Sequence, residues 1–240
     1  MTNINSPYYD QCWVTRAVER GDHREVVGGM WEEIGSLQLN LLVSHGLKPD
    51  EYLLDIGCGS LRGGVHIVRF LEPEHYFGTD LNSCLLDAGY RRELLPLGLD
   101  KKLPRTSLIV DDAFSFERFG VRFDRALAFS VFTHLPLNSI RVCLERLAEV
   151  MVPGGIFHAT FFELPVGTPS SATVEHAPAG IVTHGDLDPY HYKLADLRYA
   201  ANGLPWKVEY VGSINHPRGQ RLVNFVRLTT VAEENPGSDI

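Results

Sequence analysis

The sequence has no long hydrophobic run and no cluster of lysine and arginine. No apolar stretch reaches the roughly 18 residues that a membrane-spanning helix needs. The polar N-terminus also lacks the apolar core of a signal peptide. The net charge is −8 at pH 7, whereas proteins that bind a nucleic-acid backbone usually carry a basic face. We therefore expect neither a membrane nor a nucleic acid as a partner.

Cysteine is also scarce. No two of the four cysteines have the spacing of a zinc site or of a disulfide framework, so they predict reduced thiols in a cytoplasmic protein. They are Cys12, Cys58, Cys84 and Cys143. The length of 240 residues fits one α/β domain with a small appendage.

What the sequence does contain is a strand, a glycine turn and a helix in direct succession. Residues 52–56 form an apolar run typical of a buried parallel strand, and residues 65–71 resume with helical spacing. Gly57 and Gly59 lie between them, where glycine lets the backbone turn sharply and approach a ligand. This succession is the first half of a nucleotide-binding βαβ unit.

The residues around the turn favour one nucleotide class over another. A dinucleotide fingerprint needs glycine where this sequence has Arg62. Asp55 ends the strand, and a carboxylate there suits an ammonium group and would repel a phosphate. The Asp-x-Gly-x-Gly spacing, together with Val-Pro-Gly-Gly at 152–155, resembles the class I S-adenosylmethionine-dependent methyltransferases. The resemblance covers about residues 31–228 and implies S-adenosyl-L-methionine as the cofactor.

Strand and helix patterns alternate along the rest of the chain. The expected strands cover residues 52–56, 75–79, 106–110, 123–129, 156–162, 206–211 and 222–228. The resemblance implies a Rossmann-like α/β fold, with a seven-stranded, mostly parallel sheet in the order 3-2-1-4-5-7-6. Its last strand is antiparallel, and helices cover both faces.

The same pattern suggests how the chain divides. We expect residues 1–46 to form a helical cap over the cofactor pocket, with helices at 11–20 and 30–44 and a break at 21–29. Residues 47–229 form the methyltransferase domain, and residues 230–240 a disordered tail. Residues 164–190 show no periodicity over most of their length and are too long for an ordinary connection. Their place after the fifth strand favours a lid, with a passive loop as the alternative.

Ligands of open α/β sheets bind at the carboxyl ends of the strands. Asp80 ends the second strand, where it could accept hydrogen bonds from both ribose hydroxyls or cap a helix. The resemblance implies that Asp112 accepts from the adenine amino group and that the N–H of Ala113 reaches a ring nitrogen; Asp111 is the alternative. The predicted cofactor-binding residues are Asp55, Gly57, Cys58, Gly59, Arg62, Asp80, Leu81, Asp112, Ala113 and Ser130.

Methyl transfer to a hydroxyl needs a positioned acceptor and a base. His134 follows the fourth strand, and an imidazole with an ordinary pKa of about 6.5 suits proton removal near neutral pH; packing on the next helix is the alternative. Glu163, at the end of the fifth strand, is the second candidate. His158, inside that strand, is more typical of a core histidine.

Two short segments are candidates for the acceptor site. For residues 190–192, packing at the entry of a helix is an equally consistent alternative, and for residues 216–218 the alternative is a structured turn. The residues are Tyr190, His191, Tyr192, His216 and Arg218. Metal-dependent members carry acidic residues after the fourth strand, where this chain has Ser-Val-Phe-Thr at 130–133, so we expect no catalytic metal.

Three runs carry a narrower resemblance: Trp-Glu-Glu-Ile-Gly at 31–35, Gly-Cys-Gly-Ser-Leu-Arg-Gly-Gly at 57–64 and His-Pro-Arg-Gly-Gln at 216–220. They are similar to bacterial small-molecule methyltransferases encoded with glycan-assembly genes, and to mycobacterial sugar 1-O-methyltransferases of methylmannose polysaccharide synthesis. The resemblance implies O-methylation of a saccharide or related polar metabolite. N- or S-methylation by proximity alone and a non-catalytic cofactor-binding partner subunit are the alternatives. A homodimer is compatible with the sequence.

Overall fold

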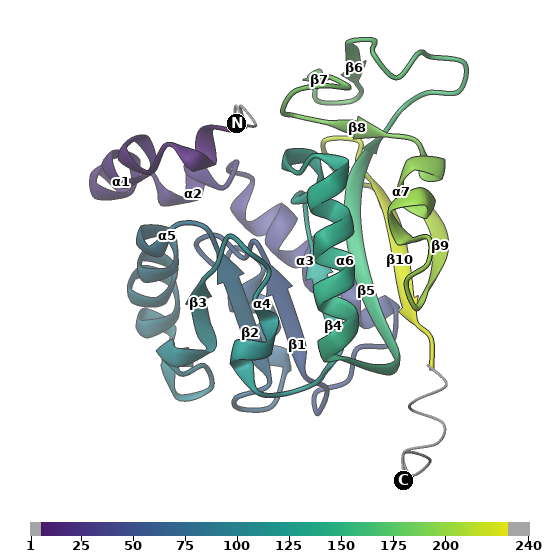
Figure 1. Cartoon of the computed structure of the whole chain (residues 1–240). Coiled ribbons are helices and arrows are strands. Elements are labelled where there is room, and N and C mark those ends of the chain that lie inside the picture. Colours follow the sequence, from purple (N-terminus) through teal and green to yellow (C-terminus); the bar gives the residue numbers. More distant parts are fainter. Residues whose placement is uncertain (1–5, 230–240) are drawn as a thin grey trace, which may run out of the picture.

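The computed structural model describes residues 6–229, which form one open sheet with helices on both faces (Figure 1). The strands follow the order β3-β2-β1-β4-β5-β10-β9. The first five are parallel neighbours, and β10 runs antiparallel to both β5 and β9. The bounds are β1 Leu53–Ile56, β2 Tyr76–Asp80, β3 Leu108–Val110, β4 Phe123–Ala128, β5 Met151–Glu163, β9 Trp206–Ser213 and β10 Arg221–Arg227. The predicted fold class and strand order are therefore confirmed.

Two apolar clusters explain why the sheet is covered on both sides. One joins the sheet to α6 and α7, and the other joins it to α3 and α4. All four residues of β1 are buried, which accounts for its apolar character apart from Asp55. The helix bounds are α1 Gln11–Arg20, α2 His23–Val26, α3 Trp31–Ser44, α4 Gly64–Phe70, α5 Ser83–Ala88, α6 Leu137–Val150 and α7 Leu194–Ala201.

The N-terminal elements lie over the carboxyl ends of the strands. Helix α1 packs on α5 through Val14, Val18 and Leu85, at the end of the molecule where β1 and β2 finish (Figure 1). The expected break at 21–29 contains the short helix α2. The prediction of a disordered tail at 230–240 lies outside the described residues.

Residues 164–190 contain regular structure that periodicity did not predict. Strands β6 (Val174–His176) and β7 (Ile181–Thr183) form a hairpin, and β8 (His191–Tyr192) just beyond it pairs in parallel with the end of β5. The hydroxyl of Thr183 lies 2.8 Å from His176 Nε2 and 2.8 Å from His191 Nδ1. These strands are two or three residues long and partly polar, so no alternating apolar pattern marks them.

Among the helices of residues 6–229, none combines the length and the apolar character that crossing a lipid bilayer demands.

Candidate functional site

A cavity opens at the carboxyl ends of β1, β2 and β4, between the sheet and the N-terminal elements. It holds about 1090 Å³ of space free of atoms, part of it open solvent. Nine of the ten predicted cofactor residues line it: Asp55, Gly57, Cys58, Gly59, Arg62, Asp80, Leu81, Asp112 and Ser130. The cap contributes Ser6, Tyr8, Tyr9, Val27 and Gln38.

The floor of the cavity is the turn after β1, and it requires glycine for two reasons. Gly57 has φ +69° and Gly59 has φ +56°, a backbone region that L side chains adopt at a cost. A Cβ on Gly57 would also lie 2.6 Å from a methyl of Val131, and one on Gly59 would lie 2.6 Å from a methyl of Val27. The turn therefore brings backbone to the cavity at positions where a side chain has no room.

Asp80 is held beside this turn by backbone donors. One carboxylate oxygen accepts from the N–H of Gly59 at 2.9 Å, and the other accepts from the N–H of Asn82 at 2.9 Å. Desolvation raises the pKa of Asp80 to about 6, against the lowering effect of these hydrogen bonds. Each oxygen keeps a lone pair that a ligand hydroxyl could use.

Asp55 is the more buried carboxyl, with 3 % of its surface exposed. It accepts a hydrogen bond of 2.6 Å from the hydroxyl of Tyr76. Desolvation raises the pKa of Asp55 to about 7; the Tyr76 hydrogen bond opposes this shift, and the nearby charge of Asp80 adds to it. A cationic ligand group would favour the ionised form of both carboxyls.

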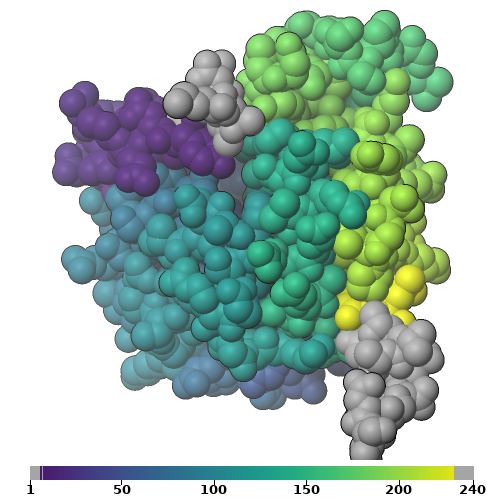
Figure 2. All heavy atoms as spheres, in the orientation of Figure 1, coloured from purple at the N-terminus to yellow at the C-terminus, as the bar shows by residue number. Residues whose placement is uncertain are grey.

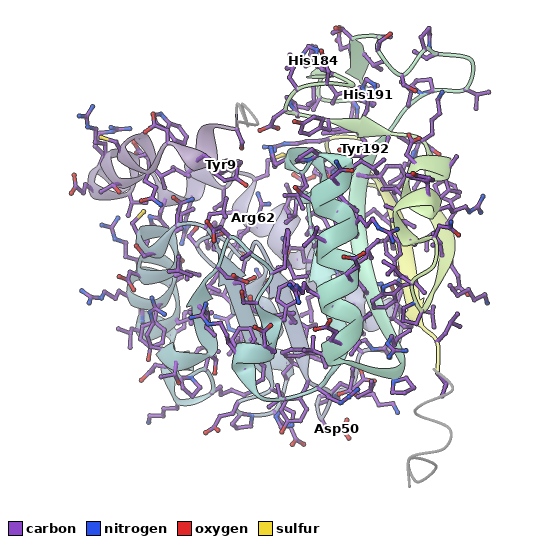
Figure 3. All side chains as sticks on the ribbon, viewed as in Figure 1. Tyr9, Asp50, Arg62, His184, His191 and Tyr192 are labelled. Atoms are coloured by element: carbon purple, nitrogen blue, oxygen red, sulfur yellow. The ribbon has the colours of Figure 1, made fainter. Side chains whose placement is uncertain are left out.

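Arg62 lies on the cap side of the cavity, opposite the segment that carries His191 and Tyr192 (Figure 3). It donates to the carbonyl of Gly29 at 2.8 Å, and its Nε is buried without a hydrogen-bond partner among the described residues. Desolvation, followed by the charge of Arg218, lowers the pKa of Arg62 to about 10.

His216 and Arg218 do not line the cavity, contrary to their prediction as acceptor ligands. The ring of His216 stacks on Phe129, which does line it, with ring centres 5.1 Å apart. Arg218 donates to the carbonyl of Gly28, and its own N–H donates to His216 Nδ1 at 3.0 Å. His216 and Arg218 therefore contact residues next to the cavity without lining it, which agrees with the alternative of a structured turn.

Ser130 and His134 follow β4 and reach the cavity from the other side. The Ser130 hydroxyl donates to Gln220 at 3.1 Å, and its N–H donates to Thr160 at 2.7 Å, which fixes the loop to β5 and the approach to β10. His134 Nδ1 lies 2.6 Å from a carboxylate oxygen of Asp188. The ring of Tyr8 meets that of His134 edge-on, with centres 5.0 Å apart.

Glu163, the second candidate base, lies away from the cavity. It accepts from the hydroxyl of Tyr210 at 2.5 Å and lies 3.8 Å from Arg221 Nε. These partners belong to β9 and β10, and Glu163 is not among the lining residues. The end of β5 extends beyond the ends of β1 and β4, so this strand end does not meet the others.

Tyr190, His191 and Tyr192 are buried and do not line the cavity. The two tyrosine rings stack within the core cluster with centres 6.2 Å apart. The alternative reading as packing residues therefore describes them, and the prediction that they touch the acceptor lacks a geometric basis. Ala113 is also outside the lining, and its N–H donates to Asp111 at 3.1 Å, so it is not free for an adenine nitrogen.

Sequence reasoning missed the cap residues of the cavity and Asp188. Tyr8 and Tyr9 precede the first helical pattern, so no periodicity pointed to them. Asp188 lies in the irregular segment 164–190 and meets a histidine 54 positions earlier in the chain. Figure 2 shows the cap and this segment as separate masses at the same end of the molecule.

Among residues 6–229, no group of three or more His, Cys, Asp or Glu side chains is arranged to hold a metal ion.

Residues 54–157 match the family described as "Methyltransferase domain". A magnesium protoporphyrin IX methyltransferase from Synechocystis PCC 6803 with bound SAH shares 14% identity over 91% of this chain and 99% of its own, with a TM-score of 0.60. A TehB-like SAM-dependent methyltransferase from Corynebacterium glutamicum shares 15% identity over 91% of this chain and 99% of its own, with a TM-score of 0.56. The chain thus has the Rossmann-like fold of these methyltransferases.

Proposed function

We propose that this chain, which has the methyltransferase fold and a methyltransferase domain at residues 54–157, is a class I S-adenosylmethionine-dependent O-methyltransferase. Its acceptor is a hydroxyl of a saccharide or a related small polar metabolite. The observation that carries the proposal is one cavity lined by Asp55, Asp80, the glycine turn and His134.

The residues present fit S-adenosyl-L-methionine. Asp80 has acceptor capacity left for ribose hydroxyls, and Asp55 offers a desolvated carboxyl to an ammonium group. Asp111 already accepts from the N–H groups of Ala113 and Ser115, at 3.1 and 2.8 Å. Asp112 lines the cavity and is exposed, so it is the carboxylate that would receive the adenine amino group.

When held by these carboxyls and the glycine turn, S-adenosylmethionine would supply an activated methyl group, with its sulfur as the leaving group. The role of the chain is to orient the acceptor and to take its proton. His134 has Nδ1 beside Asp188, which leaves Nε2 to accept the hydroxyl proton. A base is needed for a hydroxyl acceptor and not for a neutral amine, which is why His134 supports O-methylation.

We infer a sugar as the acceptor from the narrower resemblance to sugar 1-O-methyltransferases. Methylation of a small metabolite at nitrogen or sulfur by proximity alone is the competing function. The intact glycine turn and both carboxyls speak against a non-catalytic partner subunit. The four cysteines, which all lie within residues 6–229, are unpaired, which supports a cytoplasmic location.

The test is a labelled-methyl assay against a panel of mono- and oligosaccharides, with small amines and thiols as a second panel. We expect transfer to a saccharide hydroxyl, and we expect His134→Gln to lose about 10²- to 10⁴-fold in turnover while binding S-adenosylmethionine normally. Asp50→Asn is the matched control, because Asp50 lies at the opposite end of the molecule (Figure 3). Transfer only to amines or thiols, with unchanged turnover in His134→Gln, would refute O-methylation.

A further inference from the structure

The contact between His134 and Asp188 joins the loop after β4 to the segment 164–190. The 2.6 Å separation of His134 Nδ1 and the Asp188 oxygen is that of a charge-assisted hydrogen bond. The Asp188 side chain is 2 % exposed, whereas that of His134 is 31 % exposed. The other oxygen of Asp188 is buried without a hydrogen-bond partner among the described residues. Since a buried carboxylate is costly unless it is paired, His134 is the contact that stabilises it.

Two more hydrogen bonds connect the loop after β4 to the end of the segment 164–190 and to β8 just beyond it, one on each side of His134 in sequence. The N–H of Tyr190 donates to the carbonyl of Thr133 at 2.7 Å. The hydroxyl of Tyr192 donates to the carbonyl of Leu135 at 2.5 Å. The position of Asp188 relative to the imidazole is therefore set by the backbone on both sides, and not by one side-chain contact alone.

The segment is in turn fixed to the sheet. Strand β8 pairs with the end of β5, with Phe162 opposite His191 and Glu163 opposite Tyr192. The N–H of Leu164 donates to the carbonyl of Tyr192 at 2.9 Å. The segment thus leaves the sheet at Leu164 and returns to it at Tyr192, and Asp188 lies just before that return.

We propose that Asp188 is the positioning residue of His134, so that the segment 164–190 acts as part of the catalytic apparatus and not as a passive loop. The carboxylate holds the proton of the neutral imidazole on Nδ1 and leaves the lone pair of Nε2 for the cavity. When the acceptor O–H gives its proton to Nε2, Asp188 stays ionised and stabilises the resulting imidazolium. This role rests on the proposed function, because it presupposes that His134 is the base.

Nitrogen-15 spectroscopy of the histidine rings tests the placement of the proton without an acceptor. The wild-type protein is measured at mildly alkaline pH, both alone and saturated with S-adenosylhomocysteine, and His134→Gln assigns the signal. We expect Nδ1 to be protonated and Nε2 to be bare. In Asp188→Asn and Asp188→Ala we expect the proton to move toward Nε2. Asp186→Asn removes the same charge from an exposed position on the same segment and should leave the ring signal unchanged.

Kinetics on the saccharide that gives the highest turnover in the labelled-methyl assay tests the consequence. Asp188→Asn should lose at least tenfold in kcat, up to the 10²- to 10⁴-fold expected of a lost base, while the KM and the affinity for S-adenosylmethionine stay within about twofold, since kcat alone reports an interaction made in the transition state. Asp186→Asn should match the wild type.

Three outcomes would overturn the positioning role: a wild-type ring with its proton on Nε2, ring signals unchanged in both Asp188 variants, or an unchanged kcat in Asp188→Asn. The wild-type spectrum decides the first even if a variant does not fold. Failure to bind S-adenosylhomocysteine would instead overturn the proposed function, and the ring measurement on the ligand-free protein distinguishes the two failures.

Discussion

Burial changes the ionisation of two carboxyls in the cavity, Asp55 with a pKa of about 7 and Asp80 with a pKa of about 6. Asp55 is therefore half ionised near pH 7 and Asp80 near pH 6, and a ligand that carries a cation binds the ionised forms better. The affinity for S-adenosylmethionine should therefore fall as pH is lowered through 7 and 6, up to tenfold per pH unit for each proton taken up. Calorimetric titration across this range measures it, and Asp55→Asn should flatten the upper part of the curve. A constant affinity would show that the ionisation of neither carboxyl is coupled to binding of the ligand.

The same shifts fix the sign of the pH dependence of stability. A carboxyl with a folded-state pKa above its unfolded value of about 4 binds more protons in the folded state. Between about pH 4 and pH 7, Asp55 and Asp80 therefore make the free energy of unfolding of the unliganded protein fall as pH rises. Saturating S-adenosylmethionine should offset this loss in thermal unfolding experiments. A rise in stability through that window, traced to these residues by Asp55→Asn, would contradict the assignment.

The glycine turn offers a matched pair of substitutions. Gly57 and Gly120 share φ +69°, but only at Gly57 would a Cβ meet an atom within 4 Å. Gly120→Ala should cost only the roughly 1–2 kcal/mol of a left-handed alanine. Gly57→Ala should cost more and should also weaken cofactor binding, because the turn must shift away from Val131. Equal stability and equal affinity for the two variants, by thermal unfolding and calorimetry, would contradict the close approach.

The sequence predicts site residues that lie at the ends of strands, such as Asp55 and Asp80. It does not predict residues that reach the site only through tertiary contacts, such as Asp188. Asp55 and Asp80 follow apolar runs and so were placed at the edge where parallel strands meet. Asp188 has no local signal, because its role depends on a partner far away in the chain. Glu163 follows an apolar run as well, but its strand extends past the edge that the other strands share.

Among the elements, helices were the most predictable because apolar residues recur every three or four positions. Helix α1 has the predicted bounds, Gln11–Arg20, and α3, Trp31–Ser44, begins one residue after its predicted start. Strand β5 starts earlier than expected, at Met151. The Val-Pro-Gly-Gly run at 152–155 lies inside this strand as an irregularity, since the pairing with β4 shifts between Phe123 and Arg125.

The hydroxyl of Thr183 links the hairpin β6–β7 to β8 through His176 and His191, and we expect it to stabilise the hairpin. Thr183→Val keeps the shape of the side chain and leaves His176 and His191 without their common partner. An unsatisfied buried group costs about 1–3 kcal/mol, so hydrogen exchange in residues 164–190 should speed up while the rest of the sheet is unaffected. Thr173→Val, which removes an exposed contact with His184, is the control. Unchanged exchange in Thr183→Val would mean that other contacts order the hairpin.

In the molecule as a whole, the cavity lies where the cap meets the carboxyl ends of the strands, and the segment 164–190 borders it through the contact of Asp188 with His134. The strand order could be inferred from the family resemblance, because alternation alone supplies a strand count and no order. The part of the cap that forms the cavity wall could not be inferred, since Tyr8 enters through contacts with Asn82, Val26 and His134 that no local pattern encodes.

We expect this cavity to hold S-adenosylmethionine, and calorimetry on three proteins measures that binding. The wild type and Asp50→Asn should each bind one S-adenosylmethionine per chain with equal affinity. Asp80→Asn should bind about 10- to 100-fold more weakly, as expected for a lost hydrogen bond to a charged group. The account is contradicted if neither S-adenosylmethionine nor S-adenosylhomocysteine binds the wild type while a nicotinamide dinucleotide does.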